Sequence, residues 1–194
     1  MSNLFDRVRA ALDGDCTVPL AGDDFEFPED GPLTPAAVLV ALTDSDQPGM
    51  ILTVRRADLR THAGQVAFPG GRIDEGEDGI AAALREAEEE IGLPRAAVRV
   101  AGVIADYRTI TDYRVTPVIA VVPPGLDLAP HEAEVAALFE VPLDVVLDPA
   151  RQHRRSTLFR GRMRHYYEIE WDGHRIWGAT ASIIVNLTAR LQWR

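Results

Sequence analysis

The sequence predicts one α/β domain built around a mixed β-sheet, and three observations lead to that prediction. The chain has 194 residues, of which 46% are hydrophobic and 26% charged, a composition typical of a domain with a sizeable core. Short β-rich segments precede and interrupt the helical ones without a regular strand–helix–strand rhythm. No internal repeat or low-complexity tract occurs. We therefore expect one domain over residues 35–194 and an N-terminal extension, a helix and an acidic loop, over residues 1–34.

The N-terminal extension begins with a short amphipathic segment, MSNLFDRVRAAL, which predicts a helix. Residues 14–34 mix Pro, Gly and Asp with isolated aromatic residues, a composition that indicates an irregular loop. Residues 36–43 and 50–55 are β-rich and flank the turn cluster DSDQPG, which predicts a hairpin. Residues 64–71 then carry a short apolar stretch into a glycine pair.

The first long helix is predicted over residues 78–91. Its apolar residues Ile80, Leu84, Ala87 and Ile91 have the spacing of one helix face, which we expect to pack into the core. Gly92 stands where a helix commonly ends.

The remaining elements are predicted from β-rich runs, turn residues and helical periodicity. Residues 98–105 and 115–122 are expected to be strands and residues 139–142 a shorter one. The dipeptide DG at positions 172–173 predicts a hairpin. A helix over residues 179–191 follows, because apolar residues again recur at helical spacing.

Composition excludes several classes of function. All 20 basic residues are arginines, so a P-loop, a Schiff-base lysine and a protein-kinase lysine are excluded. The single cysteine, Cys16, excludes an intrachain disulfide and a cysteine-based zinc site. A net charge of −10 disfavours a nucleic-acid partner. The longest apolar run, residues 36–42, is far shorter than the roughly 20 residues of a membrane span. With no export signal at the N-terminus, we expect no membrane association and a cytoplasmic location.

Three carboxylates share one face of the helix predicted over residues 78–91. Glu86, Glu89 and Glu90 are spaced i, i+3 and i+4, and we expect them to point out of the core. Like charges at these spacings repel by a few tenths of a kcal/mol per pair, and a divalent cation would reverse that repulsion. Oxygen ligands favour Mg²⁺ or Mn²⁺. On helix composition alone, a solvated acidic face is the alternative.

The surrounding sequence, GRIDEGEDGIAAALREAEEEIGL from residue 71, resembles the Nudix box. The positions that match its fixed residues are Gly71, Glu77, Arg85, Glu86, Glu89, Glu90 and Gly92. The resemblance implies a Nudix fold, in which a mixed β-sheet is sandwiched between α-helices, and metal-dependent hydrolysis of a pyrophosphate bond.

The resemblance to the Nudix box also implies roles for individual residues. Glu86 and Glu90 would be metal ligands, Glu89 a further ligand or the general base, and Mg²⁺ or Mn²⁺ the cofactor. Arg85 adjoins the carboxylates and is expected to orient Glu89 through a charge-assisted hydrogen bond. We expect Glu77 to reach the start of the helix, where an acidic residue is favoured.

A second resemblance concerns residues 51–71, ILTVRRADLRTHAGQVAFPGG, which are similar to the motif that precedes the box in Nudix coenzyme A pyrophosphatases. Arg56 stands where that motif usually has a small residue. This resemblance implies that coenzyme A is the substrate and is cleaved to 4′-phosphopantetheine and adenosine 3′,5′-bisphosphate. Carried over by position, the substrate-binding residues would be Arg55, Arg60, Gly70 and Gly71.

Two further groups of residues are candidates for the site. Nudix enzymes often recruit an extra carboxylate from a loop, so Glu134 is a candidate base or second-metal ligand, against a solvated loop acid. A basic stretch contains Arg151, Arg154, Arg155, Arg160, Arg162 and Arg164. It is a candidate for holding the 3′-phosphate of coenzyme A, or else a solvated surface.

Two other functions stay open at this point. The first is a Nudix hydrolase of ADP-ribose, or of another nucleoside diphosphate derivative or triphosphate, and only the motif before the box argues against it. A non-catalytic Nudix-fold nucleotide sensor is disfavoured because every box carboxylate is present. The sequence does not predict an oligomeric state.

Overall fold

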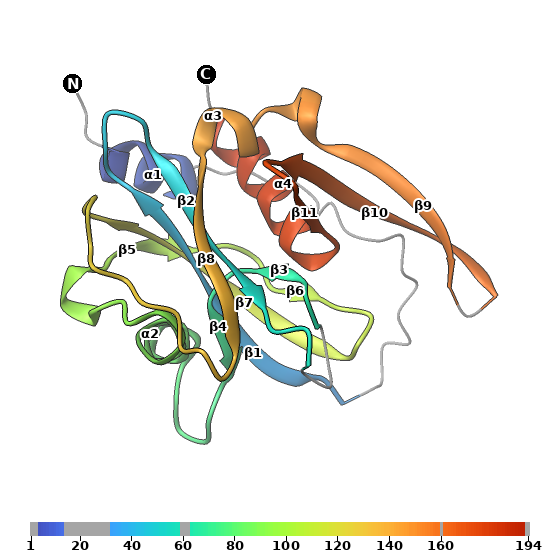
Figure 1. The fold of residues 1–194 in the computed structure, drawn as a ribbon, viewed down its shortest axis with the longest axis horizontal. Coiled ribbons are helices and arrows are strands. Elements are labelled where there is room, and N and C mark those ends of the chain that lie inside the picture. Colours follow the sequence, from blue (N-terminus) through green and yellow to red (C-terminus); the bar gives the residue numbers. More distant parts are fainter. Residues whose placement is uncertain (1–3, 14–31, 59–62, 160, 193–194) are drawn as a thin grey trace.

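The computed structural model describes residues 4–13, 32–58, 63–159 and 161–192, which form four α-helices and two β-sheets (Figure 1). The helices are α1 (Leu4–Asp13), α2 (Gly79–Ile91), α3 (Leu143–Val146) and α4 (Ala179–Leu191), with 3₁₀ turns at Arg95–Ala97 and Pro149–Arg151. The eight-stranded sheet consists of β1 (Thr34–Thr43), β2 (Gly49–Arg55), β3 (Val66–Ala67), β4 (Gly70–Arg72), β5 (Arg99–Val103), β6 (Tyr107–Arg108), β7 (Tyr113–Val122) and β8 (Val135–Pro142). The three-stranded sheet consists of β9 (His153–Phe159), β10 (Arg162–Trp171) and β11 (His174–Trp177).

Strand β1 is central to the larger sheet and makes it mixed, as predicted. β1 is parallel to β7 along its whole length, from Thr34 opposite Tyr113 to Thr43 opposite Val122. It is antiparallel to β2 and to β4, and β2 is in turn antiparallel to β3 and β8. The hairpin predicted around the DSDQPG turn is thus confirmed as β1 and β2. The helix expected in residues 1–12 is confirmed as α1, whereas residues 14–31 of the predicted acidic loop, with Cys16, lie outside the described residues.

The larger sheet is covered on both faces (Figure 1). Ala37, Leu39 and Ala41 of β1 pack in a core with α2, while Val40 and Leu42 pack in a second core with α1 and α4. Burial on both faces explains why residues 36–42 are continuously apolar rather than alternating. In the part of the chain that the structure describes, no helix is long and apolar enough to cross a membrane.

Helix α2 has the predicted extent, but a different face of it is buried. Gly92 ends the helix with φ of 66°, as expected of a left-handed C-terminal glycine. The buried apolar residues are Ala82, Ala83, Ala87 and Ile91, whereas Ile80 is 38% exposed. The expectation that Ile80 packs in the core is therefore wrong. Small alanine side chains let the helix lie close to the sheet, and this rotates the buried face toward Glu90.

The C-terminal third contains a strand that the periodicity did not predict. β9 pairs with β10, which starts at Arg162 and enters the hairpin predicted at residues 172–173. Glu168 of β10 is 6% exposed and accepts hydrogen bonds from Arg155 of β9 and Arg175 of β11. Burial opposes ionisation of Glu168, but these two arginines outweigh it and lower its pKa. Two ion pairs to one buried carboxylate thus join all three strands. β8 also begins earlier than expected, at Val135, because it pairs with β2.

Candidate active site

The carboxylates of α2 lie where that helix meets β4, the end of β2 and the segment at residues 129–134. The main-chain N–H of Ala129 donates to the carbonyl of Ile91 at 3.1 Å, and that of His131 donates to the carbonyl of Glu90 at 2.7 Å. These bonds hold the segment against the C-terminal end of α2. Strand β2 ends beside it, since Arg55 pairs with Val135 of β8. Four separate parts of the chain therefore contribute to one site.

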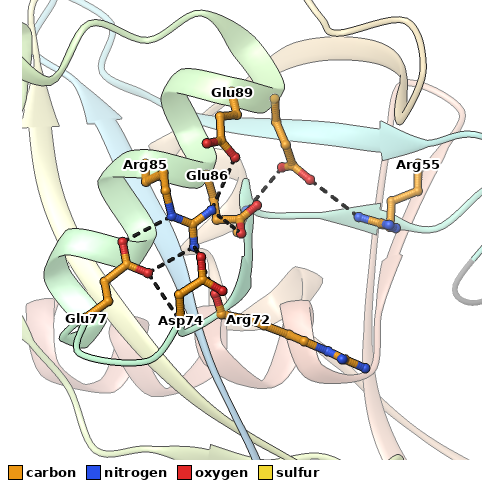
Figure 2. A network of polar contacts seen from close by, with 9 residues as sticks. Arg55, Arg72, Asp74, Glu77, Arg85, Glu86 and Glu89 are labelled. Atoms are coloured by element: carbon orange, nitrogen blue, oxygen red, sulfur yellow. Dashed lines mark hydrogen bonds and ion pairs between the residues drawn. The ribbon is translucent and has the colours of Figure 1, made fainter.

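Arg85 is the centre of the polar network on the exposed side of α2 (Figure 2). Its Nε and Nη2 donate to the two carboxylate oxygens of Glu77 at 3.1 and 3.0 Å. Its Nη1 donates to Glu86 at 2.8 Å and to Glu89 at 3.2 Å, and Nη2 also donates to the carbonyl of Arg72 at 3.0 Å. The contact with Glu89 expected from the sequence is present. The hydrogen bond from Arg85 lowers the pKa of Glu77.

Glu77 does not cap the helix, which corrects the expectation that it reaches the helix start. Asp78 is the N-cap, and its side chain accepts a hydrogen bond from the N–H of Ala81 at 2.8 Å. Glu77 instead accepts from the N–H of Asp74 at 3.2 Å and from Arg85. It therefore fixes the preceding turn and Arg85 relative to each other.

Glu90 is buried, with only 4% of its surface exposed. The expectation that all three carboxylates point out of the core is thus wrong for Glu90. One of its oxygens accepts a hydrogen bond from the N–H of Gly70 at 3.1 Å, and the other lies 3.5 Å from Nη1 of Arg55. The pKa of Glu90 is raised to about 7, chiefly by burial; the charges of Glu86 and Glu134 contribute to the rise, and Gly70 and Arg55 oppose it. Glu90 therefore has less nearby positive charge than it needs to stay ionised.

The glycine pair of β4 permits these close approaches. Gly70 has φ of 158°, and a Cβ there would lie 2.4 Å from the carbonyl oxygen of Ala37. A Cβ on Gly71 would lie 2.5 Å from the carboxyl group of Glu86. A larger residue at either position would displace β1 or a site carboxylate. Gly70 thus lies against β1, and Gly71 lies against Glu86 of α2.

Arg55 is the basic side chain that the structure places beside the buried carboxylate of Glu90. Its side chain is 24% exposed, and its Nε is buried without a hydrogen-bond partner in the described structure. Its contact with Glu90 is long for a charge-assisted hydrogen bond. Arg55 therefore has donors available for an anionic ligand. Arg60, the other arginine expected here, lies outside the described residues.

Glu134 and the basic stretch have different relations to this site. Glu134 is exposed, and its charge acts on Glu90, so the structure brings it near the α2 carboxylates. The basic stretch lies on β9, β10 and the preceding turn. Those strands pack on the core that contains α4, and α2 packs on the opposite face of the larger sheet. The structure therefore does not bring the basic stretch to the α2 carboxylates. Arg160 lies outside the described residues.

Comparison with known proteins identifies the family. A model of the NUDIX domain matches residues 33–160. The chain belongs to the Nudix family. An "Uncharacterized Nudix hydrolase NudL" of Escherichia coli O7:K1 is 44% identical over 157 residues, which are 80% of this chain and 82% of the relative. A protein of the same description from Shigella boydii is 45% identical over the same shares.

Solved structures support the same fold. RenU, a Nudix hydrolase from M. smegmatis, aligns with a TM-score of 0.50 and 29% identity, over 57% of this chain and 71% of its own. The Nudix fold predicted for the present chain is thus confirmed. The residues expected to match the box lie on β4, on the turn that follows it and on α2, with Gly92 directly after the helix.

The donor set of this Nudix hydrolase fits a hard divalent cation. Carboxylate oxygens are the ligands that Mg²⁺ and Mn²⁺ prefer. Glu90 is a buried carboxylate whose pKa is raised chiefly by burial, with smaller contributions from the charges of Glu86 and Glu134. In the described residues, no three acidic, histidine or cysteine side chains converge closely enough to enclose an ion. Arg85 instead lies between Glu86 and Glu89. In the structure, the charges of these two carboxylates are therefore compensated by Arg85.

The raised pKa of Glu90 predicts how the stability of the metal-free protein depends on pH. The folded state holds the proton up to about pH 7, whereas an unfolded glutamate loses it near ~4.3. The free energy of unfolding in chelator should therefore fall as pH rises from 5 to 8. Denaturant unfolding of the unmodified protein and of Glu90→Gln measures this, and the difference between the two slopes isolates Glu90. Glu88→Gln, at an exposed position on the same helix, is the control. An unchanged slope in Glu90→Gln would contradict the prediction.

Proposed function

We propose that this Nudix hydrolase cleaves the pyrophosphate bond of coenzyme A, giving 4′-phosphopantetheine and adenosine 3′,5′-bisphosphate. The observation that carries the proposal is the position of residues 51–58 and 63–71, the described parts of the segment 51–71. Their Arg55, at the end of β2, has its Nη1 3.5 Å from the buried carboxylate of Glu90 and an Nε without a hydrogen-bond partner. Their glycine pair lies against two box glutamates, Glu86 and Glu90. The segment that resembles the motif of coenzyme A pyrophosphatases therefore borders the carboxylates that would act on a pyrophosphate.

In this proposal, Glu86 and Glu90 hold Mg²⁺ or Mn²⁺, with Glu89 as a further ligand or as the base. When bound, the cation neutralises the pyrophosphate oxygens and makes the phosphorus easier to attack. Arg85 orients Glu86 and Glu89 by charge-assisted hydrogen bonds. The carboxylate of Glu89 or Glu134 takes the proton of the attacking water.

The substrate is held by residues outside the helix. Arg55 and Arg60 bind phosphate oxygens as charged donors. The pyrophosphate lies beside Gly70 and Gly71, whose lack of a Cβ lets β4 lie close against Ala37 and Glu86. We further propose that residues 35–194 form the hydrolase domain, that the protein acts on a small molecule in the cytoplasm, and that nucleic acids and membranes are not its partners.

A second candidate is hydrolysis of ADP-ribose or another nucleoside diphosphate derivative. The observation in its favour is that the basic stretch, a candidate for the 3′-phosphate of coenzyme A, packs on the face of the sheet opposite α2. A role as a nucleotide sensor without catalysis is disfavoured because all box carboxylates are present.

Product analysis distinguishes these functions. Purified protein is incubated separately with coenzyme A, ADP-ribose and dGTP, each with millimolar Mg²⁺ and with excess chelator, and the products are separated by chromatography. We expect 4′-phosphopantetheine and adenosine 3′,5′-bisphosphate in equal amounts from coenzyme A, in the presence of Mg²⁺ alone. Faster release of AMP from ADP-ribose favours the second candidate, and full turnover in chelator contradicts the metal assignment.

The carboxylate assignment predicts the effect of neutral substitutions. Glu86→Gln and Glu90→Gln should each lower kcat by at least about 10²-fold, because each removes a charged ligand needed in the transition state. Steady-state kinetics with Mg²⁺ measures the effect, and circular dichroism confirms the fold. Glu88→Gln is the matched control and should retain the kcat of the unmodified protein. Rates near that of the unmodified protein in both variants would mean that these carboxylates form only an acidic surface.

A further inference from the structure

Arg56, the residue after β2, connects two segments beside the site. Its Nη1 donates to the carbonyl of Glu132 at 2.7 Å. Its Nε and Nη2 donate to the two carboxylate oxygens of Asp58 at 2.8 and 2.6 Å. Its main-chain N–H donates to the carbonyl of Glu134 at 3.0 Å. The guanidinium thus joins the chain that leaves β2 to the segment that enters β8.

The segment that Arg56 reaches is a short turn. The N–H groups of Glu134 and Val135 donate to the carbonyl of His131 at 3.0 and 2.9 Å, and the N–H of His131 donates to the carbonyl of Glu90 at 2.7 Å. The turn is therefore fixed to α2 at one end by a main-chain bond. On the exposed side of the turn, the carbonyl of Glu132 accepts its hydrogen bond from the guanidinium of Arg56.

We propose that Arg56 is a positioning residue for Glu134. By holding the turn at residues 131–134, it keeps the Glu134 carboxylate close enough to act at the α2 carboxylates. The inference rests on the proposed function, in which Glu134 is a base or a second-metal ligand. A small side chain at position 56 would leave the turn with its main-chain bonds alone, and displacing a catalytic group by about 1 Å can cost up to about 10²-fold in rate.

The energetics separate this role from a purely structural one. The side chains of Arg56 and Asp58 are 41% and 65% exposed, and exposed ion pairs contribute little to folding. Loss of the Arg56 side chain should therefore leave the melting temperature nearly unchanged while it lowers kcat. The matched control is Arg95, on the turn after α2. It makes a similarly exposed ion pair, at 2.8 Å, with Glu88 of α2.

A double-mutant cycle tests the inference. Arg56→Ser should lower kcat about tenfold with KM within about twofold, and it should lower kcat no further in a Glu134→Gln background. Arg56→Lys, which can still donate to the carbonyl of Glu132 but lacks the fork that holds Asp58, should give an intermediate kcat. Arg95→Ser should have the kcat of the unmodified protein. Thermal unfolding of each variant shows whether it is folded.

Three results would overturn the inference: unchanged kcat in Arg56→Ser, the same loss from Arg56→Ser in both backgrounds, or unchanged kcat in Glu134→Gln. The cycle is measured on coenzyme A and on ADP-ribose. Coupling between Arg56 and Glu134 on ADP-ribose, without turnover of coenzyme A, would contradict the proposed substrate and still support the positioning role. Turnover of coenzyme A without coupling would contradict the positioning role alone.

Discussion

The burial of one carboxylate, that of Glu90, is the constraint on which the arrangement of the site depends. A carboxylate in a low-dielectric setting needs donors or cations to stay ionised. Here it has one main-chain donor, Gly70, and one distant guanidinium, Arg55, while the charges of Glu86 and Glu134 add to the difficulty. The shortage of positive charge at Glu90 makes this position the natural place for a divalent cation.

The elements around Glu90 are held so that each supplies one part of the site. Arg85 holds Glu77, Glu86 and Glu89 together on the exposed side of α2. Its positive charge compensates these outer carboxylates and leaves the buried Glu90 to Gly70 and Arg55. The larger sheet separates this site from the arginine-rich strands β9 and β10, which pack with α4. Substrate recognition in our account therefore depends on the segments that flank β2 and β4 rather than on the most basic part of the chain.

The sequence predicts the features that depend on local signals: the extent of α2, its terminal Gly92, the hairpin of β1 and β2, and the grouping of the box glutamates. It does not predict the burial of Glu90, because periodicity favours Ile80 as a core residue, whereas the alanines determine how closely the helix packs on the sheet. β9 is missed because its arginines resemble a solvated surface. The buried acceptor of Arg155, Glu168 of β10, is 13 residues away in the sequence and meets it only in the folded chain.

Proton release on metal binding tests the central claim most directly. Mn²⁺ is titrated calorimetrically into the metal-free protein near pH 7 in two buffers of different ionisation enthalpy. Because the pKa of Glu90 is about 7, a cation that binds there displaces its proton, and the unmodified protein should release about half a proton per ion. Glu90→Gln should release none. Absence of Mn²⁺ binding by the unmodified protein, or equal proton release from Glu90→Gln, would contradict the assignment of Glu90 as the buried ligand.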